Sequence, residues 1–268
     1  MDKKIGIVFT SRNNYELFDN WCKKTDTTGY EILNIDEDST DEQKILGKSI
    51  CKKHGITYLD REERGMLWNL STACNYFENL NKEYILYFWN GDSTPLHHVA
   101  RTPLEPGDKY YRSNRYWPST RVRYSDKFKK PFAVESIMWT AGLLNINQYK
   151  THIIPTSDYH MFHSWDDMCF QFLNKNIYNI VLPEFCLAHE QRSKLEFGIP
   201  KDSPNNENGK REHYFSKFNH LEVFEDRWGF NYSDRNTFEA VKDSYKDTLL
   251  WEFYNHDPID GPLKSFDI

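Results

Sequence analysis

Carboxylates and hydroxyls crowd the turn after one short apolar segment of the sequence. Residues 32–35 are typical of a buried strand, and residues 36–41 after it read Asp-Glu-Asp-Ser-Thr-Asp. In an open α/β sheet, ligands bind just beyond the carboxyl ends of the strands. An acidic strand end favours hydrogen-bond donors, such as a base N–H or ribose hydroxyls, or a metal ion. A second interpretation stays open, in which Ser39, Thr40 and Asp41 cap the next helix.

Two other polar groups have residue types suited to chemistry. Residues 90–92, Asn-Gly-Asp, follow an apolar strand expected at 83–89, and Asp166 and Asp167 begin a helix expected at 166–175. Oxygen ligands at a strand end suit a hard divalent cation, although Asn-Gly-Asp is also a common turn composition. The paired carboxylates suit acid–base catalysis, although capping alone is the simpler explanation from the residues.

The composition limits the class of protein. The chain has 268 residues and a net charge of −6, so no strong attraction to nucleic acid or anionic membranes is expected. Its five cysteines are scattered without metal-finger spacing, which favours reduced thiols. The first apolar run is too short for a signal peptide and no stretch is long enough to span a membrane. We therefore expect a soluble, cytoplasmic protein.

Strands and helices are expected to alternate through the first 95 residues. Strands are predicted at 5–10, 32–35, 56–59 and 83–89, and helices at 15–24, 41–54 and 66–80. Asn14 is expected to cap the first of these helices, and Gly55 is expected to end the second. This order predicts an α/β fold with a mostly parallel sheet and helices on both faces. No glycine-rich phosphate loop follows the first strand, which leaves a metal ion or basic side chains to hold a phosphate.

The remaining residues are less regular. A strand-like stretch at 132–144 turns into a short helix, and a further strand is expected at 177–182. We expect a main domain over 1–200, with a donor half at 1–95 and an acceptor half at 96–200. A flexible loop is expected at 201–210, followed by a helical C-terminal extension at 211–268 packed on the domain.

Several of these stretches, taken in order, resemble the family-2 glycosyltransferases, which have the GT-A fold. Residues 35–41 resemble the second-strand motif VDDGSTD, with Glu in place of the second Asp and Asp in place of Gly. The resemblance covers residues 4–230 in patches, and the other matching stretches are 5–13, Gly65 with its helix, 83–88, 165–168, 182–184, 189–193 and 224–229. One departure concerns the metal-binding DxD motif, where this chain has Asn90-Gly91-Asp92.

The resemblance implies transfer of a sugar from a nucleotide-sugar donor, UDP-linked, to a hydroxyl of a glycan or other acceptor. Thr10, Arg12, Asp36 and Glu37 would hold the nucleoside.

The resemblance also implies a metal site at the altered motif. Asp92 and His189, with Asn90, would hold Mn²⁺ or Mg²⁺ against the diphosphate, a Lewis-acid role.

Asp167 or Asp166 would be the general base for direct displacement with inversion, and we prefer Asp167 because Asp166 lies nearer the expected cap. Alternatives are a nucleotidyltransferase and a degenerate module that binds a nucleotide or glycan without transfer. The basic stretch 112–130 keeps a nucleic-acid acceptor open as well.

Overall fold

The structure is a computed structural model of the chain. It describes residues 4–25, 27–62, 65–89, 93–95, 132–134, 141–158, 163–175, 177, 179–181, 187–189, 220–229 and 250–251. Helices in this part of the chain are α1 Tyr15–Lys24, α2 Asp41–His54, α3 Met66–Asn79, α5 Ile146–His152, α6 Ser164–Leu173 and α9 His220–Trp228. Strands are β1 Ile5–Ser11, β2 Ile32–Glu37, β3 Thr57–Arg61, β4 Tyr84–Trp89, β5 Ser93–Pro95, β6 Phe132–Val134, β7 Ala141–Asn145, β8 Asn179–Val181, β9 Leu187–His189 and β10 Leu250–Trp251.

A five-stranded sheet with the order β3-β2-β1-β4-β7 forms the centre of the fold. The first four of these strands are parallel, and β7 pairs antiparallel with β4. A helix between two parallel strands returns the chain to the end of the sheet where the previous strand began. Successive strands joined in this way therefore run in the same direction. The prediction of an α/β fold with a mostly parallel sheet flanked by helices is confirmed.

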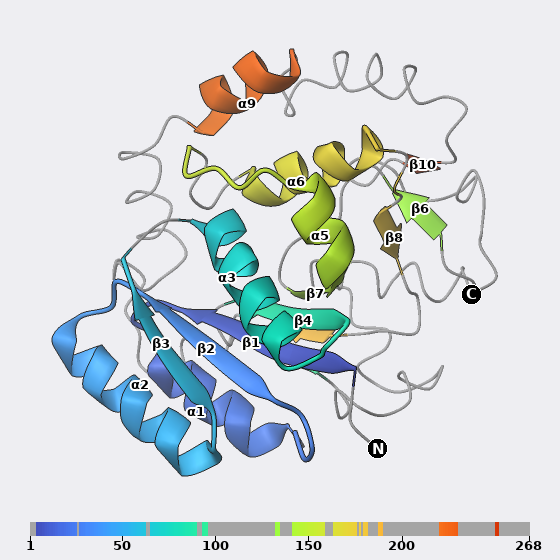
Figure 1. The fold of residues 1–268 in the computed structure, drawn as a ribbon. Coiled ribbons are helices and arrows are strands. Elements are labelled where there is room, and N and C mark those ends of the chain that lie inside the picture. The colour runs from blue at the N-terminus through green and yellow to red at the C-terminus, as the bar shows by residue number, and fades with distance from the viewer. Residues whose placement is uncertain are drawn as a thin grey trace.

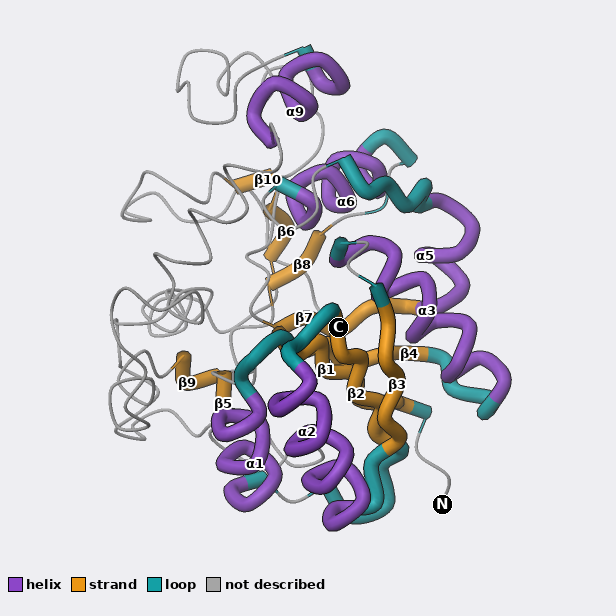
Figure 2. The backbone as a smooth tube through the Cα atoms, turned by 90° about the vertical axis from the view of Figure 1, so that its left-hand side faces the viewer, coloured by secondary structure: helices purple, strands orange, loops and turns teal. Residues whose placement is uncertain are grey.

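The two faces of the sheet carry different helices. Helices α1 and α2 cover one face, and α3, α5 and α6 cover the other (Figures 1 and 2). Alternate residues of β4 point to opposite faces, as the two-residue period of a strand requires. Ile85 and Tyr87 join the core under α3 and α6, whereas Leu86 and Phe88 join the core under α1 and α2.

Local signals account for the boundaries of α2. Thr40 is its N-cap, and its side chain accepts a hydrogen bond from the backbone N–H of Gln43. Gly55 ends the helix in the left-handed conformation at φ 69°. Asn14 also lies at an N-cap, that of α1, but its side chain does not cap the helix. Its Oδ1 accepts instead from the backbone N–H of Arg12 at 3.1 Å, so the expected cap of α1 is wrong.

Two smaller sheets lie outside the central one among the described residues. Strands β10, β6 and β8 form one, and β5 and β9 form the other. Strand β10 lies in the expected C-terminal extension, so this segment contributes a strand as well as helix α9. Residues 201–219 of the expected loop and helix lie outside the described residues. In the part that the structure describes, no helix is long and apolar enough to cross a membrane.

Gly47 in α2 provides a test of the packing between α1 and α2. A Cβ at this position would overlap the buried Tyr15 ring. Helix propensity alone predicts that Gly47→Ala stabilises the protein by about 1 kcal/mol. We expect overpacking to outweigh that gain, with a net loss of about 1 to 2 kcal/mol in the free energy of unfolding. Chemical denaturation measures this, with Ser49→Ala at an exposed position of the same helix as the control. A Gly47→Ala protein more stable than the parent would contradict the contact.

Candidate functional site

The carboxyl ends of β1, β2 and β4 meet at one edge of the sheet. Ser11 of β1 pairs with Asp36 of β2, and Thr10 pairs with Trp89 of β4. The residues predicted to bind a ligand therefore lie at the carboxyl ends of neighbouring strands. This is the edge at which ligands bind in open α/β sheets.

Asp36 is the centre of a buried polar network rather than an open ligand. Its side chain is fully buried, and its two oxygens accept from the Tyr15 hydroxyl at 2.5 Å and the Ser39 backbone N–H at 2.9 Å. Asn34 donates to the same Tyr15 hydroxyl and accepts from Ser11. Burial, and then the charge of Asp36, raise the pKa of Tyr15, so the tyrosine stays a donor. Asp36 thus holds the turn after β2 to helix α1.

Glu37 connects the end of β2 to the start of α3. Its Oε1 accepts from the backbone N–H of Gly65 at 2.7 Å, and the residue is buried. Gly65 has φ 91°, a conformation that favours glycine, and α3 begins at the next residue. The glycine that the resemblance singled out is therefore the point at which a carboxylate meets a helix N-terminus.

Thr10 and Arg12 have different surroundings. The Thr10 hydroxyl lies 2.9 Å from the Tyr87 hydroxyl, and Thr10 is buried. Arg12 is partly exposed, and its Nη2 lies 3.9 Å from Oδ2 of Asp38, a loose ion pair. Of the predicted nucleoside residues, Arg12 is therefore the most accessible one.

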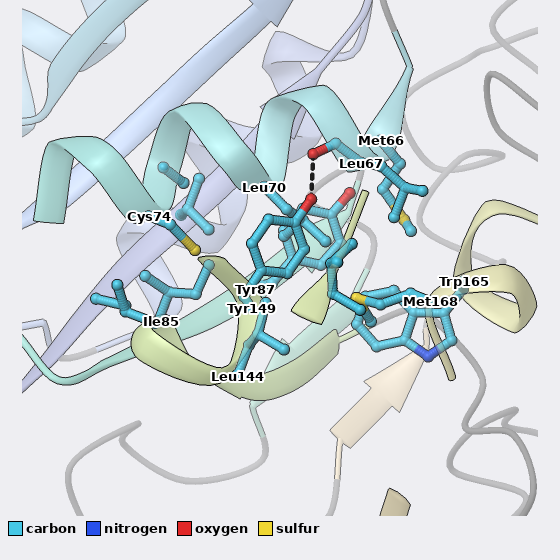
Figure 3. Packing of buried hydrophobic residues seen from close by; sticks show 14 of the residues in the cluster. Met66, Leu67, Leu70, Cys74, Ile85, Tyr87, Leu144, Tyr149, Trp165 and Met168 are labelled. Atoms are coloured by element: carbon cyan, nitrogen blue, oxygen red, sulfur yellow. Dashed lines mark hydrogen bonds between the residues drawn. The ribbon is translucent and has the colours of Figure 1, made fainter. Parts of the chain in front are cut away.

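Tyr87 connects this edge of the sheet to helix α6. Its ring stacks on Trp165 with the ring centroids 5.9 Å apart, and both belong to the core drawn in Figure 3. Gly142 of β7 pairs with Tyr87, and a Cβ on it would meet the Trp165 ring. The N-terminal turn of α6 therefore lies over the carboxyl end of β4, and Asp166 directly follows Trp165 in the chain.

Asp167 is fully buried and held from two sides. Its Oδ2 accepts from Nε2 of Gln171 at 2.7 Å. Its Oδ1 accepts from Nε1 of Trp228 at 2.9 Å and lies 3.2 Å from Nε of Arg227. Arg227 and Trp228 both belong to α9, about 60 residues further along the chain than Asp167. The carboxylate is thereby enclosed by protein donors.

Asp166 lies next to Asp167 in the chain and contacts a histidine. Its Oδ2 is 3.3 Å from Nδ1 of His163, which precedes the helix with φ 60°. Helix α6 begins at Ser164, two residues earlier than the sequence predicts, so neither aspartate occupies the N-cap. The preference for Asp167 as base relied on that cap position, and the reason for it is wrong.

The predicted metal ligands are only partly within the described residues. Asn90 and Asp92 lie outside them. His189 lies in β9, where the backbone ladder pairs it with Ser93, the residue after Asp92. Among the described residues, no group of three or more His, Cys, Asp or Glu side chains has metal-site geometry. The ladder places the backbone of His189 opposite the residue that follows Asp92, which no local pattern indicated.

Sequence reasoning also missed residues that shape the site. Tyr15 and Gln171 carry no motif, because each lies in a segment that looks like ordinary core. Tyr87 falls within the stretch 83–88 that resembles the family, but it too looks like an ordinary core position. Arg227 and Trp228 fall within the stretch 224–229 that resembles a family motif, yet its partner was not apparent. A buried carboxylate needs hydrogen-bond donors. The need for such donors is the one signal that could have led to these partner residues.

Comparisons with known proteins found matches among solved structures only. No family model matches it, and no curated protein matches it in sequence. Solved structures that match are GT-A-like glycosyltransferases and nucleotidyltransferases. A fragment of S. aureus TarS is 12% identical with a TM-score of 0.43, covering 68% of this chain and 59% of that one.

Two further matches have similar scores. Glucosyl-3-phosphoglycerate synthase from Mycobacterium tuberculosis, in complex with Mn²⁺, UDP and glucosyl-3-phosphoglycerate, is 11% identical with a TM-score of 0.38, covering 73% of this chain and 75% of that one. A cytidylyltransferase from Leptospira borgpetersenii is 10% identical with a TM-score of 0.35, covering 59% of this chain and 68% of that one.

The buried network around Asp36 predicts a large difference between two neighbouring carboxylates. In Asp36→Asn, the amide cannot accept from both Tyr15 and the Ser39 N–H, and a buried donor loses its partner. We expect a loss of about 2 kcal/mol or more in the free energy of unfolding. Asp38→Asn, at an exposed position, should change it by less than about 0.5 kcal/mol. Thermal unfolding of both variants measures this, and equal losses would show that the network does not stabilise the fold.

Proposed function

We propose that this protein is a glycosyltransferase that moves a sugar from a nucleotide-sugar donor to an acceptor hydroxyl, with inversion by direct displacement. The observation that carries the proposal is the link from Thr10 through Tyr87 to Trp165. It brings the candidate donor edge and the carboxylates of α6 together. Nucleoside recognition and proton abstraction must occur within one site, so this proximity is required for transfer.

The donor side consists of the ends of β1 and β2. Arg12 is partly exposed and positive, so it is suited to contact the nucleotide. Glu37 ends β2 and accepts a hydrogen bond from the residue before α3. It is the carboxylate that we assign to the base or ribose. Asp36 supports this edge through its hydrogen bond from Tyr15, and Thr10 supports it through the contact between its hydroxyl and that of Tyr87.

Asp166 is the residue to which we assign the role of general base. Both oxygens of Asp167 are already engaged by protein side chains, which leaves Asp166 as the better candidate to meet an acceptor hydroxyl. Asp166 differs in direction by about 100° around the helix. It lies beside His163, and a histidine is itself able to exchange a proton.

A divalent metal ion fits the residues near the β5–β9 ladder. An aspartate carboxylate and a histidine imidazole are ligands that Mn²⁺ accepts, and His189 pairs with the residue that follows Asp92. Asp92 and His189, with Asn90, would hold the ion. When bound, the ion would supply positive charge for the leaving diphosphate.

A thermal-shift panel of UDP-, GDP-, dTDP- and CMP-sugars, each with and without Mn²⁺, tests the donor. We expect one nucleotide to raise Tm by about 5 °C or more at about 100 times its Kd. UDP-sugars with Mn²⁺ come first, because the M. tuberculosis synthase structure holds both UDP and Mn²⁺. Indifference to every nucleotide would overturn the proposal. Stabilisation by a nucleoside triphosphate alone would favour a nucleotidyltransferase instead, and binding without any transfer in a donor and acceptor screen would favour a binding module.

Asp166→Asn tests the assignment of the base. Removing a general base lowers kcat by about 100-fold or more. The Tm increase caused by the donor should remain, because the substitution is isosteric and lies on the acceptor side. Asp158→Asn, an exposed substitution before α6, is the matched control and should keep full activity. Undiminished kcat in Asp166→Asn would exclude this residue as the base.

A further inference from the structure

Helix α6 is enclosed on opposite faces by different parts of the chain. Trp165, Met168 and Phe172 belong to the core beneath α3. His163, Asp167 and Phe170 recur at helical spacing on the opposite side, since residues four and seven positions apart share a face. This second face, which we call the outer face of α6, meets α9.

The contacts between the outer face and α9 are both aromatic and polar. Phe224 of α9 lies against His163 and Phe170, with ring centroids 5.2 Å and 6.1 Å apart. Trp228 packs on Phe170 at 5.5 Å and donates its indole N–H to Asp167. Figure 1 shows α9 beyond α6 on the side away from the sheet. Phe224 is fully buried, so this is a packed interface.

Asp167 is the charged centre of this interface. A buried carboxylate is costly unless donors surround it, and the side chains of Trp228 and Arg227 from α9 both contact this one. The Arg227 guanidinium also lies 5.8 Å from the Trp228 ring, which restrains the direction of its Nε.

We propose that Asp167 is a positioning residue that fastens α9 to the outer face of α6 and so fixes the direction of Asp166. The consequence for catalysis rests on the proposed function, whereas the attachment of α9 does not. Asp166 and Asp167 are adjacent on one helical turn, so any rotation of α6 that releases one moves the other. The C-terminal helix thereby becomes part of the site without touching the substrate.

A double-mutant cycle in the full-length protein tests the attachment. Arg227→Met leaves the buried charge of Asp167 without its counterion, and we expect Tm to fall by about 10 °C. Adding Asp167→Asn removes that charge, so the double variant should be no less stable than Arg227→Met alone. Arg227→Lys should recover part of the loss, and Asp226→Asn, at an exposed position of α9, is the control. Additive losses would overturn the attachment.

Hydrogen exchange provides a second measurement of the same point. In Arg227→Met, amides of α9 and of the first turn of α6 should exchange faster, while those of β1 and β4 keep their protection. Uniformly faster exchange would mean general destabilisation and would overturn the specific role. Both measurements are independent of any substrate, so they hold whether or not transfer is detected.

The kinetic measurement separates a positioning residue from a base. If Asp167 positions Asp166, then Asp167→Asn, Arg227→Met and the double variant should lower kcat by a similar factor of about 10, at unchanged donor KM. If Asp167 is the base, Asp167→Asn should lower kcat about 100-fold or more while Arg227→Met has a much smaller effect. The second pattern would overturn the positioning role even where the proposed transfer is observed.

Discussion

The stacking of Tyr87 on Trp165 is the contact on which the arrangement of the candidate site depends. Tyr87 lies in β4, next to the central strand β1, and its hydroxyl contacts Thr10 of β1, while its ring supports the first turn of α6. An aromatic ring offers a large apolar surface with one polar end, so it serves the core and the strand ends together. Gly142 makes room for the indole on the neighbouring strand. This contact sets the first turn of α6 beside the carboxyl end of β4.

The two pairs of adjacent carboxylates show how neighbours in sequence acquire different roles. Asp36 and Glu37 point to opposite faces of β2, because strand residues alternate. Asp36 meets Tyr15 on the α1 side, and Glu37 meets Gly65 at the start of α3. Asp166 and Asp167 are separated by about 100° around α6. In the first pair both carboxylates accept from protein donors that join two elements, and in the second pair Asp167 does so.

Much of the first 95 residues was predictable, because the signals there are local. The bounds of α1 and α2 agree with the prediction, as does the left-handed Gly55. Errors arose at two helix starts, where a residue adopted a local arrangement other than the expected cap. Asn14 bonds to the turn before its helix instead of capping it, and α6 begins at Ser164 because His163 adopts the left-handed conformation. Neither choice leaves a signal in residue spacing.

The sequence alone determined the alternation of strands and helices, the mostly parallel sheet, and the edge at which Thr10 and Asp36 meet. Those properties follow from periodicity, capping and the handedness of crossovers, which act over a few residues at a time. Only the tertiary structure decided which carboxylates are enclosed, that His189 pairs with Ser93, and that Arg227 and Trp228 reach Asp167. These facts depend on long-range packing, since a buried charge takes its donors from whichever segment lies beside it. Chemical type is written in the sequence, whereas burial and partnership are properties of the folded chain.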